Sequence, residues 1–386
     1  MAVHASADPA SAVPRRVVVD PVSAPWTRAI DDAVAGHPVS VAVGSLGTVL
    51  YQHDGQVSRM PASNEKLLTS MAALDTLGAD HRFATVAAVA APPHGGTVDG
   101  DVWLVGSGDP ELSTERLATL ALRLRAAGVH QVRGSVVGDT STFSREWWAP
   151  GWIRNVSRAY VARPTALAVA GVRPGGTPER FAAAVVTDAL RSAGVRVAGE
   201  PRADGAPDDV RPVAAVRSPT LRGILTRQNH ESINFTAEMV TKALGALAVD
   251  GPGSTSAGAS FVEAWAEDRG VRARVEDGSG LSHLDRIRTV GMVSLLMASE
   301  REPWGAVLRA SLPQPGTGTL AGRLAGVPVR AKTGTLFVTP ASALSGFVVP
   351  ASGPRLTFSI FSRGMSKSTA AAIEDSIVRS LASARI

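Results

Sequence analysis

Three strand-like runs follow one another near the C-terminal end of the chain: VPVRAKTG, SALSGFVVP and RLTFSIFS. A helical pattern begins after them at Ser366. Further helical patterns occupy residues 235–249, 259–268 and 288–299. Helices in the middle of a chain and consecutive strands at its end indicate an α+β fold, in which helices are segregated from an antiparallel sheet.

The N-terminal part of the chain adds a hairpin and a helix to this pattern. Residues 39–55, VSVAVGSLGTVLYQHDG, predict two strands joined by a turn, and a helical spacing at residues 26–35 precedes them. No Gly or Pro interrupts residues 63–77, which are rich in Leu, Met and Ala. This composition predicts a largely buried helix that opens at Ser63, with that serine as its N-cap.

The length of 386 residues indicates two to three domains, at roughly 150 residues each. Residues 1–22 are rich in Ala, Pro and Ser without periodicity, which predicts a loose leader. Residues 82–212 differ from their surroundings and predict a separate, smaller α+β domain inserted into the main domain, which consists of residues 23–81 and 213–386. Within the insert, short β-like runs occupy residues 83–90, 101–105 and 132–137, and helical patterns occupy residues 114–127 and 178–193.

Composition excludes several classes of function. The net charge is +5, and the basic residues are scattered rather than clustered, so we expect no nucleic-acid partner. The chain has no cysteine, which excludes disulfides, thiolate metal sites and a cysteine nucleophile. Its eight histidines form no H-E-x-x-H pattern, so we expect neither a metal nor another cofactor. No run of 18 apolar residues predicts a transmembrane segment, and the first residues lack the apolar core of a signal peptide. The protein is therefore expected to be either cytoplasmic or a mature or trimmed form.

Three short motifs carry the candidate chemistry. They are S-x-x-K at Ser63-Asn64-Glu65-Lys66, S-x-N at Ser232-Ile233-Asn234, and K-T-G at Lys332-Thr333-Gly334. Each motif is a weak signal alone, whereas all three in this order form a strong one. The chain has only four lysines against 35 arginines, and two of the four lie in these motifs.

Ser63 and Lys66 have the spacing of a nucleophile and its base. Residues three apart on a helix lie about 5 to 6 Å from each other on one face, so the Lys66 amine can reach the Ser63 hydroxyl. A lysine serves as a base only if its pKa falls from about 10.4 toward neutrality. Burial, the positive end of the helix and a second cation, for which Lys332 is the candidate, would all lower that pKa.

The other two motifs suggest substrate binding and proton transfer. At Gly334 the absence of a side chain lets a substrate backbone lie along the strand edge. The backbone N–H groups of Ser63 and Thr335 form a candidate oxyanion hole. Ser232 is expected to relay a proton to the leaving amine, and Asn234 to orient Lys66 and the substrate amide, while the apolar Ile233 turns toward the core.

At this point the sequence resembles a known family. The segments PASNEKLLT, SIN, DGSGLS, PGTGTL and AKTGTL closely resemble the D-alanyl-D-alanine carboxypeptidases/endopeptidases of the type-4 (class C low-molecular-mass) penicillin-binding proteins. VGSGDPEL at residues 105–112 and the run VRGSVVGD at residues 132–139 resemble the inserted domain of that group. The resemblance covers residues 25–386. It implies the serine β-lactamase/DD-peptidase fold, an α/β/α sandwich with an antiparallel sheet, and a second domain inserted between the first two motifs.

The resemblance also implies an activity and a site. It implies a serine-type D-Ala-D-Ala carboxypeptidase that trims peptidoglycan stem peptides through an acyl-enzyme on Ser63, with endopeptidase action on cross-links left open. Lys332, Thr333 and Thr335 would bind the terminal carboxylate of the substrate. β-Lactams would acylate Ser63 as covalent inhibitors. The family is exported to the cell envelope, so a signal peptide would be absent because it has been removed.

Alternatives from other functional classes remain. A serine β-lactamase would need a deacylating group, and neither an E-x-x-L-N string nor a Y-x-N tyrosine is present, since Tyr51 and Tyr160 do not fit. A non-catalytic wall-binding relative would be expected to lack Ser63 or Lys66. SIN stands where the family usually has SDN, so Ile233 changes the polarity beside the motif. The DGSGLS segment at residues 277–282 is expected to be a loop at the active-site cleft, with a plain turn as the alternative.

Overall fold

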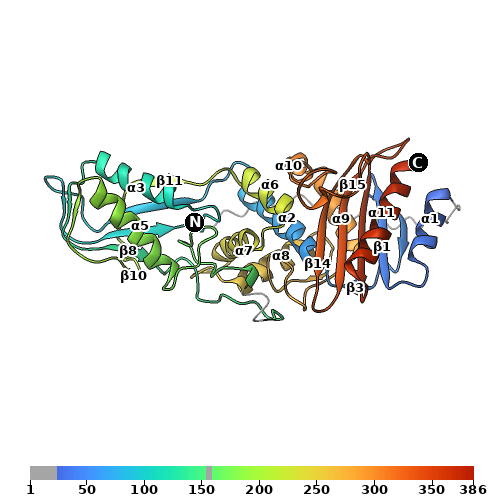
Figure 1. Cartoon of the computed structure of the whole chain (residues 1–386), viewed down its shortest axis with the longest axis horizontal. Helices are drawn as coiled ribbons and strands as arrows, with labels where there is room; N and C mark the ends of the chain where they lie inside the picture. Colours follow the sequence, from blue (N-terminus) through green and yellow to red (C-terminus); the bar gives the residue numbers. More distant parts are fainter. Residues whose placement is uncertain (1–23, 154–158) are drawn as a thin grey trace. The chain divides into compact units, whose positions relative to one another are not determined.

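A computed structural model describes residues 24–153 and 159–386 of the chain, which form two compact units (Figure 1). The first unit comprises the described residues up to Asn64 together with Glu263–Arg274 and Asp285–Ile386. The second comprises the described residues of Glu65–Val262 and Val275–Leu284. The predicted leader, residues 1–22, lies outside the described residues.

The first unit contains a five-stranded antiparallel sheet. Its strands are β1 (Val39–Ser45), β2 (Thr48–His53), β14 (Val329–Leu336), β15 (Ala341–Val348) and β16 (Leu356–Arg363). They lie in the order β14-β15-β16-β1-β2, so the N-terminal hairpin joins the C-terminal strands where β1 pairs with β16. This arrangement confirms the expected antiparallel sheet and leaves the strand that carries K-T-G at its edge.

Helices cover both faces of this sheet. On one face, α1 (Pro25–Val34) and α11 (Lys367–Ser383) pack over a core that includes Val41 and Val43 of β1. On the other face, α9 (Thr289–Ser299) packs Val293 and Met297 against Ala42. Every residue of β1 is buried, because both sides of the strand are covered. The first unit therefore has the layers of the predicted α/β/α sandwich.

Several short elements complete the first unit. They are β3 (Ser58–Arg59), β12 (Ala273–Arg274) and β13 (Arg286–Arg288), which pair in a small antiparallel sheet, the 3₁₀ turns η1 (Ala62–Asn64) and η2 (Gly318–Leu320), and α10 (Gly305–Ala310).

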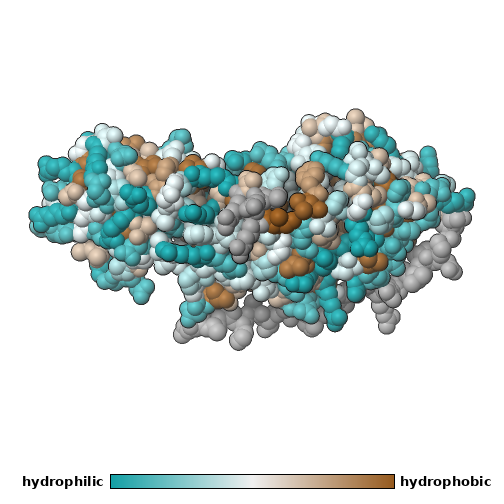
Figure 2. Space-filling model, turned by 60° about the horizontal axis from the view of Figure 1, so that its bottom comes forward, coloured by the Kyte–Doolittle hydropathy of each residue, from teal (hydrophilic) through white to brown (hydrophobic). Residues whose placement is uncertain are grey.

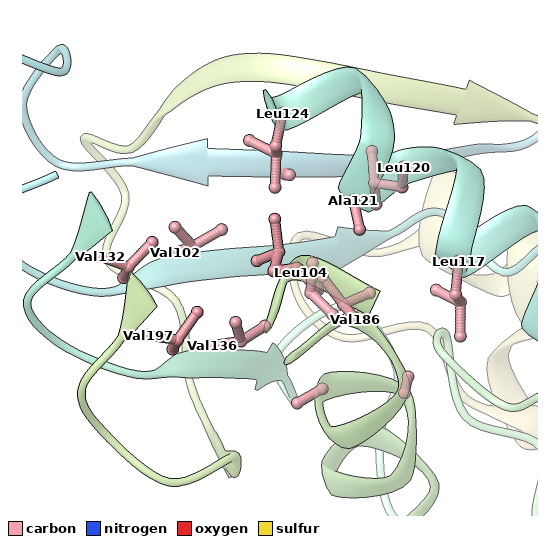
Figure 3. Packing of buried hydrophobic residues seen from close by; sticks show 14 of the residues in the cluster. Val102, Leu104, Leu117, Leu120, Ala121, Leu124, Val132, Val136, Val186 and Val197 are labelled. Atoms are coloured by element: carbon pink, nitrogen blue, oxygen red, sulfur yellow. The ribbon is translucent and has the colours of Figure 1, made fainter. Parts of the chain in front are cut away.

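The second unit contains a mixed sheet. Its five strands, in the order β10-β8-β6-β4-β11, are β10 (Arg202–Asp204), β8 (Val136–Asp139), β6 (Val102–Gly106), β4 (Ala84–Val89) and β11 (Arg211–Arg217). Helices α3 (Thr114–Ala126) and α5 (Pro178–Ser192) pack against it, and Figure 3 shows Leu124 of α3 above Leu104 of β6.

One strand prediction in this region is wrong in detail. Residues 132–137 do not form one strand, because the run splits between β7 (Gln131–Val132) and β8, which belong to different sheets. β7 lies between β5 (Thr97–Val98) and β9 (Arg196–Val197) in a small parallel sheet. The predicted bounds of an inserted domain, residues 82–212, enclose most of these strands and stay a prediction.

The remaining helices of the second unit include those that carry Lys66 of the first motif and Asn234 of the second. They are α2 (Glu65–Leu77), α6 (Leu221–Glu231) and α7 (Asn234–Ala248), and α8 (Thr255–Glu267) follows α7 along the chain. Helix α2 contacts both α6 and α7. Residues 65–74 of α2 are all buried, as its apolar composition predicted.

The surface in Figure 2 is mostly hydrophilic, and its hydrophobic residues form small separate groups. Among the residues that the structure describes, no helix combines the length and the apolar character needed to cross a membrane.

Candidate active site

Ser63 lies in the middle of the 3₁₀ turn η1, directly before helix α2. The prediction that this serine is the N-cap of the helix is therefore wrong in detail, since α2 begins at Glu65. The cause is a tight i to i−3 hydrogen bond, in which the Asn64 N–H donates to the Pro61 carbonyl at 3.1 Å. The turn gives the Ser63 peptide a conformation that a regular first helical turn would not provide.

Ser232 has a left-handed backbone conformation, and Ser63 directly follows a residue, Ala62, that has one. Ala62 has φ 46°, and Ser232 has φ 58°. For an L-residue with a side chain, this conformation costs about 1 to 2 kcal/mol. Such strain gathers at functional sites, where the surrounding structure enforces it. Three other described non-glycine residues outside the motifs, Leu46, Asp54 and Leu324, share this conformation, so it marks local strain at the two motifs and assigns no role to their serines.

Position 334 requires a glycine because η1 packs closely against β14 there. A Cβ atom at Gly334 would lie 2.9 Å from the Ser63 nitrogen and 3.0 Å from the Pro61 carbonyl oxygen, closer than side-chain carbons approach backbone atoms. Two elements far apart in sequence thus meet because this position has no side chain. The contact confirms that K-T-G and the Ser63 turn lie together in the first unit.

The Thr335 N–H points toward the open edge of the sheet. The Ala331 N–H donates to the Pro313 carbonyl at 3.0 Å, away from β15, while the Gly334 carbonyl accepts from Ser342 Oγ of β15 at 3.4 Å. Because backbone groups alternate in direction along a strand, Thr333 and Thr335 share the orientation of Ala331. The role of this N–H in an oxyanion hole stays a prediction.

Lys332 is fully buried on β14. Its ammonium donates to the Thr333 carbonyl oxygen at 2.8 Å. Lys66 and Lys242 are also fully buried, so three of the four lysines of the chain are inside the protein. Such burial is rare for lysine and indicates specific polar partners.

In the second unit, Lys66 lies in the first turn of α2 and has two short acceptor contacts. Its Nζ donates to Asn234 Oδ1 at 2.7 Å and to the Ser279 carbonyl oxygen at 2.7 Å. Asn234 is the first residue of α7. The structure therefore places Lys66 of the first motif in contact with Asn234 of the second, and the orienting role of Asn234 stays a prediction.

The S-x-N motif forms the junction of two helices. Ser232 ends α6, with its N–H bonded to the Gln228 carbonyl, and Ile233 is the N-cap residue of α7. Ile233 is half-buried, so its side chain is only partly withdrawn from solvent. The left-handed turn at Ser232 lets the chain reverse direction within two residues.

The DGSGLS segment is a loop that contacts the candidate base, rather than a remote turn. Its Ser279 carbonyl accepts from Lys66, and its Gly278 carbonyl accepts from Thr69 Oγ1 at 3.1 Å. The Asp277 carboxylate stabilises the turn of the loop by accepting hydrogen bonds from the N–H groups of Gly280 at 2.6 Å and Ser282 at 2.8 Å. The loop also contacts Trp152, whose indole N–H donates a hydrogen bond to Asp277 at 2.6 Å.

Glu238, a fully buried residue of α7, was not predicted from the sequence. Its Oε1 accepts from the Ser279 N–H at 2.9 Å and the Gly278 N–H at 3.2 Å. Burial first, and then the neighbouring Asp277 charge, raise the pKa of Glu238 to about 8. The signal that could have revealed it is an acidic residue one helical turn after Asn234, on the same face of the predicted helix.

Lys242 lies one turn further along α7, and backbone carbonyl groups hold its side chain. Its ammonium donates to the carbonyls of Ser144 at 2.8 Å, Glu146 at 2.8 Å and Pro164 at 3.1 Å. Burial lowers the pKa of Lys242 to about 8, although nearby carboxylates oppose the change. No group of acidic, histidine or cysteine side chains suited to a metal ion occurs within residues 24–153 and 159–386.

Comparison with known proteins identifies this arrangement. The model of the D-Ala-D-Ala carboxypeptidase 3 (S13) family matches residues 27–175 and 173–384. The chain is 33% identical to a D-alanyl-D-alanine carboxypeptidase of Actinomadura sp., over 92% of this chain and 82% of the relative. The chain belongs to the S13 family. As the motifs predicted, it is a serine-type D-Ala-D-Ala carboxypeptidase.

Solved structures agree with the S13 fold. Penicillin-binding protein 4 from Haemophilus influenzae matches with a TM-score of 0.81 at 21% identity, covering 92% of this chain and 99% of that one. A penicillin G-acylated predatory endopeptidase from Bdellovibrio bacteriovorus matches with a TM-score of 0.54 at 18% identity, covering 88% and 91%. The predicted α+β fold of the DD-peptidase type is confirmed.

Proposed function

We propose that Ser63 is the nucleophile of this S13 carboxypeptidase and Lys66 its general base. Ser63 Oγ forms a bond to the carbonyl carbon of the penultimate D-Ala while its proton passes to Lys66 Nζ. Ser232 then relays that proton to the leaving amine as the C–N bond breaks and the terminal D-Ala departs. Water hydrolyses the acyl-enzyme and restores Ser63.

The observation that carries this assignment is the environment of Lys66. The side chain is fully buried, and two acceptors fix its amine within 2.7 Å. Ser63 precedes it by three residues, in a strained turn against Gly334. A buried, oriented lysine three residues after a constrained serine supports the assignment of an activated hydroxyl.

The first unit supplies the groups proposed to bind substrate. A peptide laid along the open edge of β14 would meet the outward N–H of Thr335, which with the Ser63 N–H would stabilise the oxyanion. Lys332, Thr333 and Thr335 would bind the terminal carboxylate. We propose peptidoglycan stem peptides ending in D-Ala-D-Ala as substrates, β-lactams as acylating inhibitors, and the cell envelope as the place of action.

The test is the intact mass of the protein after incubation with benzylpenicillin, followed over hours. Wild type and Ser63→Ala are compared with Ser58→Ala, in which an exposed serine of the same unit is removed. We expect one stable adduct on wild type and Ser58→Ala, none on Ser63→Ala, and release of D-Ala from a peptide ending in D-Ala-D-Ala only by the first two proteins.

Two outcomes would contradict the proposal. Rapid return to free protein with hydrolysed drug would favour a β-lactamase. A wild type that forms no adduct and releases no D-Ala would favour a wall-binding protein.

A further inference from the structure

We propose that Glu238, which lies outside the three motifs, is a positioning residue for Lys66. It holds the N–H groups of Gly278 and Ser279, and the Ser279 carbonyl oxygen in turn fixes the Lys66 amine. This inference rests on the proposed role of Lys66 as the base. Every contact that carries it lies within the second unit.

The direction of the Lys66 lone pair depends on its two acceptors. A neutral amine has two N–H donors and one lone pair. If Asn234 Oδ1 and the Ser279 carbonyl occupy both donors, at 2.7 Å each, the lone pair must take the remaining direction. A base that is held in this way does not need to reorient before it accepts a proton.

Helix α7 controls both acceptors. Asn234 supplies one directly, and Glu238, one turn later on the same helix, holds the other. Its Oε1 accepts the N–H groups on either side of the Gly278 carbonyl, and Thr69 Oγ1 of α2 donates to that carbonyl oxygen at 3.1 Å. The Gly278–Ser279 peptide, which directly precedes the Ser279 carbonyl, is therefore held by groups on the two helices that also carry Asn234 and Lys66.

Glu238 can position Lys66 in its neutral, protonated form. Asp277 accepts hydrogen bonds from Trp152, Gly280, Ser282 and Ser279. Glu238 accepts two N–H groups on one oxygen only, and the charged groups that influence it are Asp277, Lys66 and Lys242. Burial and the Asp277 charge raise the pKa of Glu238 to about 8, so glutamine should replace it well.

The experiment compares Glu238→Asp and Glu238→Gln in the full-length protein. Aspartate shortens the side chain by one C–C bond and so moves the acceptor oxygen away from the Gly278 and Ser279 N–H groups. Glutamine keeps an acceptor oxygen in place. Glu179→Gln is the matched control, because Glu179 is another buried glutamate of the second unit. The readouts are the acylation rate constant at saturating benzylpenicillin, the apparent affinity before acylation, the final adduct stoichiometry and the melting temperature.

We expect Glu238→Asp to acylate about 10²-fold more slowly at saturation, since a misplacement of about 1 Å costs that much. Its affinity before acylation and its final stoichiometry of one adduct should match wild type, which a partly unfolded sample would not show. Glu238→Gln and Glu179→Gln should acylate at the wild-type rate. A folded Glu238→Asp with the wild-type rate overturns the proposal, and so does a Glu238→Gln as slow as Glu238→Asp.

Thr69→Val keeps the inference testable if Glu238→Asp does not fold. It removes the second group that fixes the Gly278–Ser279 peptide, with little change in volume, and it should slow acylation without changing the affinity. A wild-type rate in this variant overturns the proposal. Lys66→Met separates the two hypotheses: if it acylates normally, Lys66 is not the base and the proposed function fails, whereas an inactive Lys66→Met beside a normal Glu238→Asp rejects only the role of Glu238.

Discussion

A Cβ atom on Gly334 would lie 2.9 Å from the backbone nitrogen of Ser63. The closeness shows that the K-T-G strand supports the turn that presents the candidate nucleophile. It also means that one methyl group is enough to test whether this packing matters.

Gly334→Ala should acylate with benzylpenicillin about 10²-fold more slowly, because the added methyl group must push the Ser63 turn away from β14. Overpacking of this kind should also lower the free energy of unfolding by about 1 to 3 kcal/mol. Gly322→Ala is the control, since a Cβ atom there meets nothing within 4 Å. Equal acylation rates for the two variants would show that the contact has no catalytic importance.

Lys66→Arg should abolish acylation although it keeps the positive charge. Arginine does not release its proton at accessible pH and so cannot act as the base. The rate of adduct formation by intact mass is the measurement, with Lys367→Arg as control at an exposed lysine. Substantial acylation by Lys66→Arg would require a different base.

Lys242→Met should destabilise the second unit, because its ammonium satisfies three backbone carbonyls. Removing one partner of a buried charged hydrogen-bond set costs about 2 to 5 kcal/mol. Urea unfolding, compared with Lys367→Met, measures the loss. A change below about 1 kcal/mol would indicate that water replaces the ammonium at these carbonyls.

The stability of the protein should depend on pH through Glu238. Its pKa rises from the usual 4.5 to about 8 on folding, so between these values the folded state binds a proton that the unfolded state has released. The contribution is therefore fully present below about pH 4.5 and is lost as the pH rises through 8. Relative to Glu238→Gln, wild type should lose a few kcal/mol over this range, at about 1.4 kcal/mol for each pH unit that separates the two pKa values.

Urea unfolding at pH 5 and pH 8 compares the two proteins. If the difference in unfolding free energy between them were the same at both pH values, Glu238 would titrate alike in the folded and unfolded states.

Local patterns were enough to predict much of the fold. The hairpin at residues 39–55, the three C-terminal strands and the helix after Ser366 are found where alternation and helical spacing placed them. Ser366 also caps its helix by accepting from the Thr369 N–H. These features depend on neighbours in sequence, which is why the sequence alone reveals them.

Other features depend on contacts between distant segments. The contact of Lys66 with Asn234 spans 168 residues and was expected only because the chemistry of the motifs required it. The role of Glu238 could not be predicted, since it arises where the DGSGLS loop packs against α7. The 3₁₀ turn at Ser63 also escaped prediction, because helix ends are uncertain by one or two residues in sequence patterns.

The burial of three lysines leaves Lys367 as the one exposed lysine side chain. Among the lysines, reagents that attack primary amines should therefore label Lys367 of the folded protein and spare the three buried side chains. A fluorophore or a surface linker could be attached through ordinary amine chemistry at a defined position, without engineering a cysteine into a chain that has none.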